Sequence, residues 1–169
     1  IVDIQGRLVG KRFDAEYFLT DVVAHGTEGC NYLLAVDVEM NTVEGYEMSS
    51  WERGYGDFAL VPDLSTLRLV PWLEATALVM CDLRWEDGSD VAASPRQVLR
   101  GQLERLAERG WQGNASTELE LMVFRETYES ACHKGYTNLD PANHYNLDYS
   151  LLATSRVEPL IRRIRNGMD

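Results

Sequence analysis

The chain has 169 residues, of which 45% are hydrophobic and 25% charged, so it can bury a core and is not disordered by composition. Its 16 Lys and Arg stand against 27 Asp and Glu, which gives a formal net charge of −11 at pH 7 with His neutral. This acidity disfavours nucleic acid and anionic membranes as partners. No apolar run reaches the roughly 18 residues of a transmembrane helix, so we expect no membrane span.

The three cysteines, Cys30, Cys81 and Cys132, are far apart and form no Cys-x-x-Cys pair. This pattern excludes a disulfide framework or a zinc ribbon and favours a reducing, cytoplasmic location. The chain begins at Ile1 with neither an initiator Met nor a signal segment. We therefore expect a piece cut from a longer protein.

The first half of the chain predicts several short strands and one helix. Asp14 is placed to cap a helix that runs to about Ala24, with Gly26 after its end. Residues 40–57, rich in Gly, Ser, Asn and Tyr, have no period and predict a long loop. Alternation and apolar runs predict strands within residues 1–12, 32–36, 58–61, 67–70 and 76–85.

The second half predicts a helix, a strand and another helix. Ser94 is followed by a proline, which is typical of a helix start, and leucines at i, i+4 and i+7 predict a helix over 95–109. A strand is predicted over 117–124. Ser155 has a Glu three residues later, a capping-box pattern that predicts the start of a last helix there.

The composition changes near residues 90–94, where short strands give way to the helix-strand-helix order. This order is typical of an α+β fold. We predict two parts, a small domain over residues 1–92 and the beginning of a second domain over residues 93–169.

The sharpest chemical feature is the Glu118-Leu119-Glu120 sequence. Residues i and i+2 of a strand point to one face, so both carboxylates could bind a hard divalent cation such as Mg²⁺ or Mn²⁺. The alternative is the solvated face of an ordinary strand. Two carboxylates do not complete a metal site, so further ligands are needed from elsewhere.

A second candidate site is the loop over residues 44–54, which includes Glu47, Ser50 and Trp51. A carboxylate, hydroxyls and an aromatic ring together can recognise an ammonium group. The alternative is a solvated surface loop. The three histidines have no ligand spacing and predict no metal site of their own.

Taken together, these segments resemble the N-terminal part of the glutamine synthetase family. The matching segments, in chain order, are Gly6-Arg7, Glu28 to Leu33, Ser49-Ser50, Tyr55-Gly56-Asp57, Pro62-Asp63, Pro95 to Leu99 and Thr117 to Glu120. The resemblance implies a small β-grasp-type domain at 1–92 and an incomplete catalytic domain at 93–169.

The resemblance also assigns roles to four residues. Glu118 would ligate the metal that handles the nucleotide phosphates, and Glu120 the metal near glutamate. Glu47 stands where the family usually has an Asp that binds ammonium, and Ser50 matches the second Ser of that pattern. The longer Glu47, followed by Met48 where Gly is usual, favours an amine larger than ammonia, such as a polyamine or ethanolamine.

The implied reaction is the ATP-dependent joining of glutamate to an amine through a γ-glutamyl phosphate. The resemblance further implies a homo-oligomeric ring in which the loop over 44–54 acts on the neighbouring subunit. Because the other expected ligands would lie beyond residue 169, we expect the chain alone to be inactive. Two alternatives remain, a non-catalytic β-rich binding or regulatory module and a protein that only binds metal.

Overall fold

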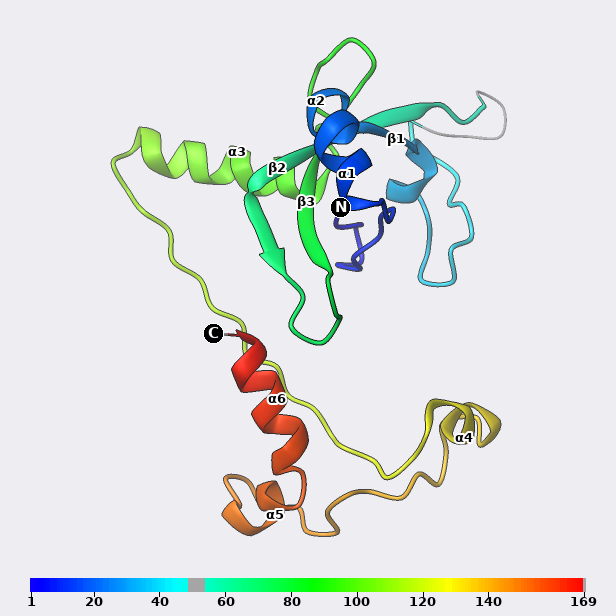
Figure 1. The fold of residues 1–169 in the computed structure, drawn as a ribbon, viewed down its shortest axis with the longest axis vertical. Helices are drawn as coiled ribbons and strands as arrows, with labels where there is room; N and C mark the ends of the chain where they lie inside the picture. The colour runs from blue at the N-terminus through cyan, green and yellow to red at the C-terminus, as the bar shows by residue number, and fades with distance from the viewer. Residues whose placement is uncertain (49–53, 169) are drawn as a thin grey trace. The chain divides into compact units, whose positions relative to one another are not determined.

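The structure, a computed structural model, describes residues 1–48 and 54–168, which form two compact units (Figure 1). The first unit comprises Ile1–Val70 and Ala75–Asn114, and the second comprises Pro71–Glu74 and Ala115–Asp169. The predicted domain boundary near residue 93 stays a prediction, and the helix that follows this position belongs to the first unit. The fold is mixed α and β, with one small antiparallel sheet.

The first unit is built on a three-stranded antiparallel sheet in the order β1-β2-β3. Its strands are β1 (Thr27–Cys30), β2 (Asp57–Leu69) and β3 (Ala77–Arg84). The register pairs Thr27 with Leu60 in β1 and β2, and Leu60 with Leu83 in β2 and β3. The predicted strand over 76–85 is therefore confirmed.

Strand β2 runs unbroken where the sequence predicts two separate strands, over 58–61 and 67–70. Its pairing with β3 shifts between Asp63 and Arg68, so a bulge lies where the two strands were expected to be interrupted. The Thr66 hydroxyl donates to the Asp63 carbonyl (2.7 Å) and accepts from the Met80 N–H (2.8 Å), which keeps the bulged segment attached to β3.

The predicted helix from Asp14 is confirmed as one continuous helical segment. The Asp14 carboxylate accepts from the N–H groups of Glu16 (2.9 Å) and Tyr17 (3.3 Å), as an N-cap does. The segment consists of α1 (Ala15–Tyr17), a π-helical turn η1 (Phe18–Val22) and α2 (Val23–His25).

The predicted strand over 32–36 is wrong, because this segment begins as a 3₁₀-helical turn, η2 (Asn31–Leu34). The Ala35 N–H donates to the Tyr32 carbonyl (2.7 Å), which closes the turn locally. Burial was predicted correctly, since Leu34 is fully buried and Val36 nearly so. The apolar residues of this segment are buried in the first unit, but the segment is not a strand of the sheet.

The core of the first unit lies between η2 and the sheet. Its buried members are Ile1, Leu34, Phe58, Leu60, Leu83 and Val91. Helix α3 (Pro95–Glu108) follows this core and confirms the helix predicted over 95–109. Among the described residues, every helix is too short or too polar to cross a membrane.

The second unit contains three helices, α4 (Tyr128–His133), α5 (Leu151–Ser155) and α6 (Glu158–Met168). The strand predicted over 117–124 does not form within the described residues: Phe124 alone makes a β-bridge, to Pro141. The Val123 carbonyl also accepts from the Ala142 N–H (2.8 Å). A strand needs hydrogen-bonded neighbours along its length, and residues 117–122 form no strand or β-bridge in the described chain. Helix α4 was not predicted.

The last helix begins later than the capping pattern predicts. The Ser155 hydroxyl donates to the Leu151 carbonyl (2.6 Å), so it bonds back to α5. Helix α6 starts at Glu158, whose carboxylate accepts from Arg162 Nε (3.3 Å) one turn later and from Arg165 Nη2 (2.6 Å) two turns later. The basic face of this helix is thus partly neutralised by its first residue.

Candidate functional site

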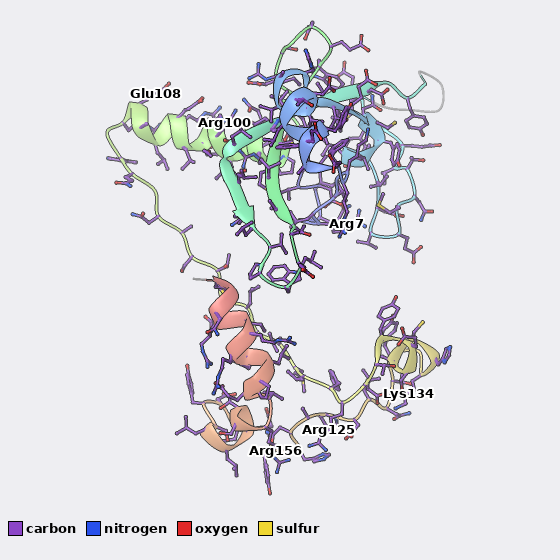
Figure 2. The ribbon with its side chains drawn as sticks, viewed as in Figure 1. Arg7, Arg100, Glu108, Arg125, Lys134 and Arg156 are labelled. Atoms are coloured by element: carbon purple, nitrogen blue, oxygen red, sulfur yellow. The ribbon has the colours of Figure 1, made fainter. Side chains whose placement is uncertain are left out.

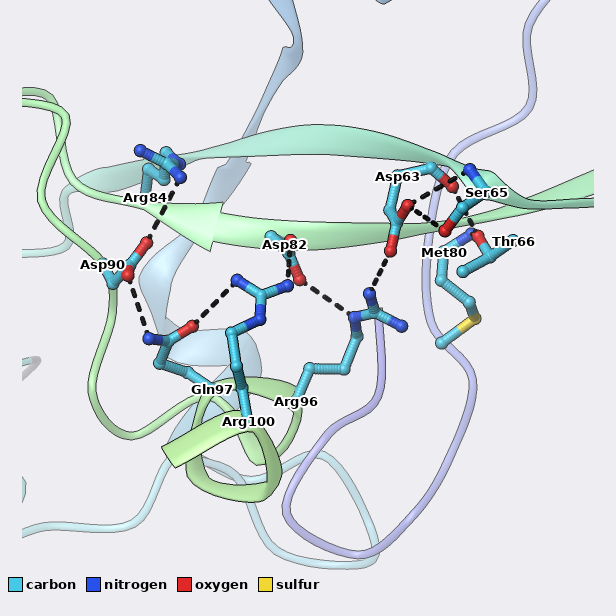
Figure 3. A network of polar contacts seen from close by, with 10 residues as sticks. All are labelled: Asp63, Ser65, Thr66, Met80, Asp82, Arg84, Asp90, Arg96, Gln97 and Arg100. Atoms are coloured by element: carbon cyan, nitrogen blue, oxygen red, sulfur yellow. Dashed lines mark hydrogen bonds and ion pairs between the residues drawn. The ribbon is translucent and has the colours of Figure 1, made fainter. Parts of the chain in front are cut away.

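Arginines from α3 fasten this helix to the sheet (Figure 3). Arg96 bridges two strands: its Nη2 lies 2.6 Å from Asp63 Oδ2 in β2, and its Nε lies 2.9 Å from Asp82 Oδ1 in β3. Arg100 Nη2 lies 2.6 Å from Asp82 Oδ2. Burial alone would raise the pKa of Asp82, but the hydrogen bonds from Arg100 and Arg96 together lower it. The network therefore holds the first turns of α3 in place.

We expect Arg96→Met to lower the free energy of unfolding of the chain by about 2 kcal/mol, because two partly buried carboxylates lose a charged donor. Urea unfolding followed by circular dichroism measures the change. The control is Arg84→Met, since Arg84 is more exposed and its contact with Asp90 is 3.6 Å long. Equal losses in both variants would contradict a special role for Arg96.

Glu47 lies exposed on the rim of a hollow of about 300 Å³ in the first unit. The other lining residues are Met48, Trp85, Val91, Ala92 and Ala93. Met48 packs against the hydrophobic core, so it anchors the chain directly after Glu47. Ser50, the other predicted member of this site, lies outside the described residues.

Asn31 is a residue of this region that the sequence reasoning missed. It is buried at the start of η2, where its N–H donates to the Gly56 carbonyl (2.9 Å) and its Nδ2 donates to the Met48 carbonyl (2.8 Å). One side chain and its backbone thus hold both ends of the loop that follows Glu47. An isolated Asn beside an apolar run has no local signal for this role.

Glu118 and Glu120 lie in the second unit, in a segment without regular secondary structure, and both are exposed. They are two hard oxygen donors, which suit Mg²⁺ or Mn²⁺. In the described part of the chain, no three His, Cys, Asp or Glu residues gather closely enough to bind a metal ion. The pair therefore fits part of a ligand set and needs further donors.

Glu126 organises the second unit near α4. Its carboxylate accepts from Lys134 Nζ (2.5 Å), the Ser130 hydroxyl (2.6 Å) and the Asp140 N–H (3.1 Å). These bonds, that from Lys134 foremost, lower the pKa of Glu126 to about 2. Figure 2 labels Lys134 among the side chains of α4 and its surroundings. The bonds join residues spaced 4, 8 and 14 apart, a pattern without a sequence signature.

We expect the Asp140 amide signal to titrate with a midpoint near pH 2 in NMR spectra, since its N–H bonds the Glu126 carboxylate. A lowered pKa means that this carboxylate stabilises the segment above pH 4.5, and that the stabilisation is lost as the pH falls towards 2. Glu126→Gln should abolish the titration, while Glu129→Gln should leave it unchanged. An ordinary midpoint near 4.5 would show that the contacts do not persist in solution.

The comparisons with known proteins agree with the resemblance in the sequence. No protein-family model matches the chain. It is 64% identical over 166 residues to gamma-glutamylethanolamide synthetase GlnA4 of Streptomyces coelicolor, covering 98% of this chain. It is 36% identical over 99% of its length to a glutamate–isopropylamine ligase of a Pseudomonas species. It is 28% identical over 91% of its length to type-1 glutamine synthetase 2 of Dictyostelium discoideum.

These relatives are ligases that form carbon–nitrogen bonds on glutamate. The chain spans 36% of the length of each of the first two relatives and 29% of the third. It is homologous to the N-terminal part of the glutamine synthetase family, as its sequence predicts.

Proposed function

We propose that this chain is the N-terminal part of an ATP-dependent ligase that joins the γ-carboxylate of glutamate to a small primary amine, ethanolamine above all. The observation that carries the proposal is the 64% identity, over 98% of the chain, to a gamma-glutamylethanolamide synthetase. We further propose that the first unit is a β-grasp-type domain, and that the protein is a cytoplasmic ring-shaped homo-oligomer.

In this proposal Glu118 and Glu120 hold two divalent cations, Mg²⁺ or Mn²⁺, together with ligands from the remainder of the protein. The cations would offset the charge of the phosphoryl group that passes from ATP to glutamate. The exposure of both carboxylates supports this role, since neither is committed to the packing of the second unit.

Glu47 would attract the positively charged amine and take up a proton as the neutral amine attacks the γ-glutamyl phosphate. Ser50 would add a hydrogen bond to the same amine. Two features support a role for this loop: Asn31 fixes its ends, and Met48 anchors it in the core. In the proposed ring, the loop would act on the active site of the neighbouring subunit.

The test is glutamate-dependent ADP formation by the purified full-length protein with one amine at a time. The amines are ethanolamine, isopropylamine, putrescine, spermine and ammonium. We expect the highest kcat/KM with ethanolamine. A strong preference for ammonium would refute the interpretation of Glu47 and Met48, and ADP formation that ignores glutamate would refute the ligase itself. The 169-residue chain alone should form no ADP.

A further inference from the structure

Asn31, the first residue of η2, holds the chain directly after Glu47. Its Nδ2 donates to the Met48 carbonyl (2.8 Å), and its N–H donates to the Gly56 carbonyl (2.9 Å). Only 4% of Asn31 is exposed, so water competes little for either hydrogen bond. One buried residue therefore fixes the chain at two places, and one of these places is next to Glu47.

The second residue of η2 supports the same region through its ring. Tyr32 and Tyr55 pack edge to face, with ring centroids 6.1 Å apart and ring planes at 85°. This arrangement is favourable for two aromatic rings. Tyr55 directly precedes Gly56, so the ring contact and the Asn31 N–H hold the same part of the chain against η2.

Met48 is held from two sides. Its side chain packs against the hydrophobic core of the first unit, while its carbonyl accepts from Asn31. Glu47 itself is exposed, so close packing around its side chain does not place its carboxylate. The position of that carboxylate therefore depends on the backbone that Asn31 and Met48 hold.

The position of Glu47 matters for one step of the proposed reaction. A group that takes up a proton must lie within hydrogen-bond reach of it, and a displacement of about 1 Å can slow a reaction by about 100-fold. In the proposed ligase, Glu47 acts when the amine attacks the γ-glutamyl phosphate. It takes no part in the earlier transfer of the phosphoryl group from ATP to glutamate. A displaced Glu47 should therefore slow the second step alone.

We propose that Asn31 is a positioning residue for this second step: through the Met48 carbonyl, it sets where the Glu47 carboxylate meets the amine. The inference rests on the proposed function, since it concerns one step of that reaction. When amine attack slows, water competes with the amine and hydrolyses the γ-glutamyl phosphate to glutamate and phosphate. Asn31 thereby also keeps the consumption of ATP coupled to the formation of the amide.

The test measures both steps in single turnovers of the full-length protein at saturating ethanolamine. Formation of ADP reports the first step, and formation of γ-glutamylethanolamide reports the second. Asn31→Leu nearly keeps the side-chain volume and removes the donor to Met48. Its amide-forming rate should fall at least about tenfold, because Glu47 is misplaced, while its ADP-forming rate should stay within about twofold of the parent rate. Over many turnovers, this variant should form less amide per ADP than the parent protein.

Thr66→Val is the matched control for a merely structural effect. Thr66 also makes two hydrogen bonds in the first unit, to Asp63 and from Met80, but these hold the bulge of β2 to β3. The control should lower the urea midpoint of unfolding, as Asn31→Leu does, and should leave both rates and the amide formed per ADP at their parent values. A merely structural role for Asn31 would make the two variants behave alike.

A second pair of variants keeps the role testable if Asn31→Leu does not fold. Tyr32→Leu removes the edge-to-face contact with Tyr55, whereas Tyr32→Phe retains the ring. Because this contact holds η2, and with it Asn31, against the chain near Glu47, Tyr32→Leu should slow the amide-forming step severalfold. Tyr32→Phe should keep the parent rate.

The outcomes separate this inference from the proposed function. ADP-forming and amide-forming rates that fall by the same factor in Asn31→Leu and Tyr32→Leu, or that do not fall, would overturn the positioning role and leave the ligase standing. A parent protein that forms no glutamate-dependent ADP would refute the ligase, and the role of Asn31 with it.

Discussion

Glu120→Gln in the full-length protein is expected to lower kcat of the proposed γ-glutamyl transfer to ethanolamine by about 100-fold, the typical effect of removing a group that stabilises developing charge. The amide keeps the size of the side chain but removes the negative charge that a divalent cation needs. Because Glu120 is exposed and is not packed in the second unit, the fold should be unaffected. Circular dichroism checks this, and steady-state ADP formation measures the activity.

The matched control is Glu129→Gln, an exposed carboxylate of α4 whose loss should leave the rate unchanged. Glu118→Gln separates the two proposed metal roles. If Glu118 serves the metal at the nucleotide phosphates, its variant should raise the Mg²⁺ concentration needed for half-maximal activity with ATP. Full activity in both the Glu118 and Glu120 variants would remove the chemical basis for a metal site at this pair.

Elements with strong local signals were predicted from the sequence. Helix α3 has a proline in its first turn and a leucine stripe at helical spacing, and its structure keeps nearly the predicted limits. Strand β3 is a long apolar run that ends at a turn with Asp and Gly. In both elements, local preference and burial favour the same conformation, so a short window of sequence is sufficient.

Elements that depend on distant partners were not predicted correctly. The apolar run after Asn31 is buried as expected, but it begins as a 3₁₀ turn, and the N–H of its first residue, Asn31, donates to the Gly56 carbonyl. Residues 117–124 have the alternation of a strand, yet only their last two residues find a neighbour, at Pro141 and Ala142, and no strand forms among the described residues. The alternation of apolar and polar residues indicates which side chains are buried. A strand also requires a neighbouring strand to pair with.

The same distinction applies to the candidate sites. The sequence predicts Glu118, Glu120 and Glu47 as site residues because a few adjacent residues are enough to indicate their chemistry. Asn31 shares the lining of a hollow with residues up to 56 positions away, among them Glu86 and Asp87. Such a site has no sequence signal, and only the folding of β2 and β3 brings its parts together.

Asp3 is the most buried charged residue among the described residues of the first unit, with 1% of it exposed, and it organises the N-terminal turn that a β-bridge between Val2 and Leu8 closes. Its Oδ1 accepts from the N–H groups of Gln5 (2.9 Å) and Arg7 (2.8 Å), and its Oδ2 accepts from Arg7 Nε (2.6 Å). Arg7, labelled in Figure 2, also donates to the carbonyls of Asp37 (3.1 Å) and Val38 (2.8 Å). Through Arg7, this carboxylate links the N-terminal turn to the turn after η2.

Asp3→Ala should lower the free energy of unfolding of the chain by about 3 kcal/mol at pH 7, because the variant leaves buried N–H groups and an arginine without their acceptor. Burial alone would raise the pKa of Asp3, but the hydrogen bonds from Arg7 and Gln5 together lower it. Its stabilisation is therefore present above pH 3.8 and is lost as the pH falls below that value, through the lowered pKa.

Urea unfolding at pH 7 and at successively lower pH should show the parent protein and the Asp3→Ala variant converging in acid. The control is Glu44→Ala, an exposed carboxylate of the same unit whose effect should stay within about 0.5 kcal/mol at every pH. A constant difference between the parent protein and the Asp3 variant would show that the loss comes from packing. Convergence would assign the loss of stability to the missing negative charge. Protonation of Asp3 in the parent protein removes the same charge as the substitution does.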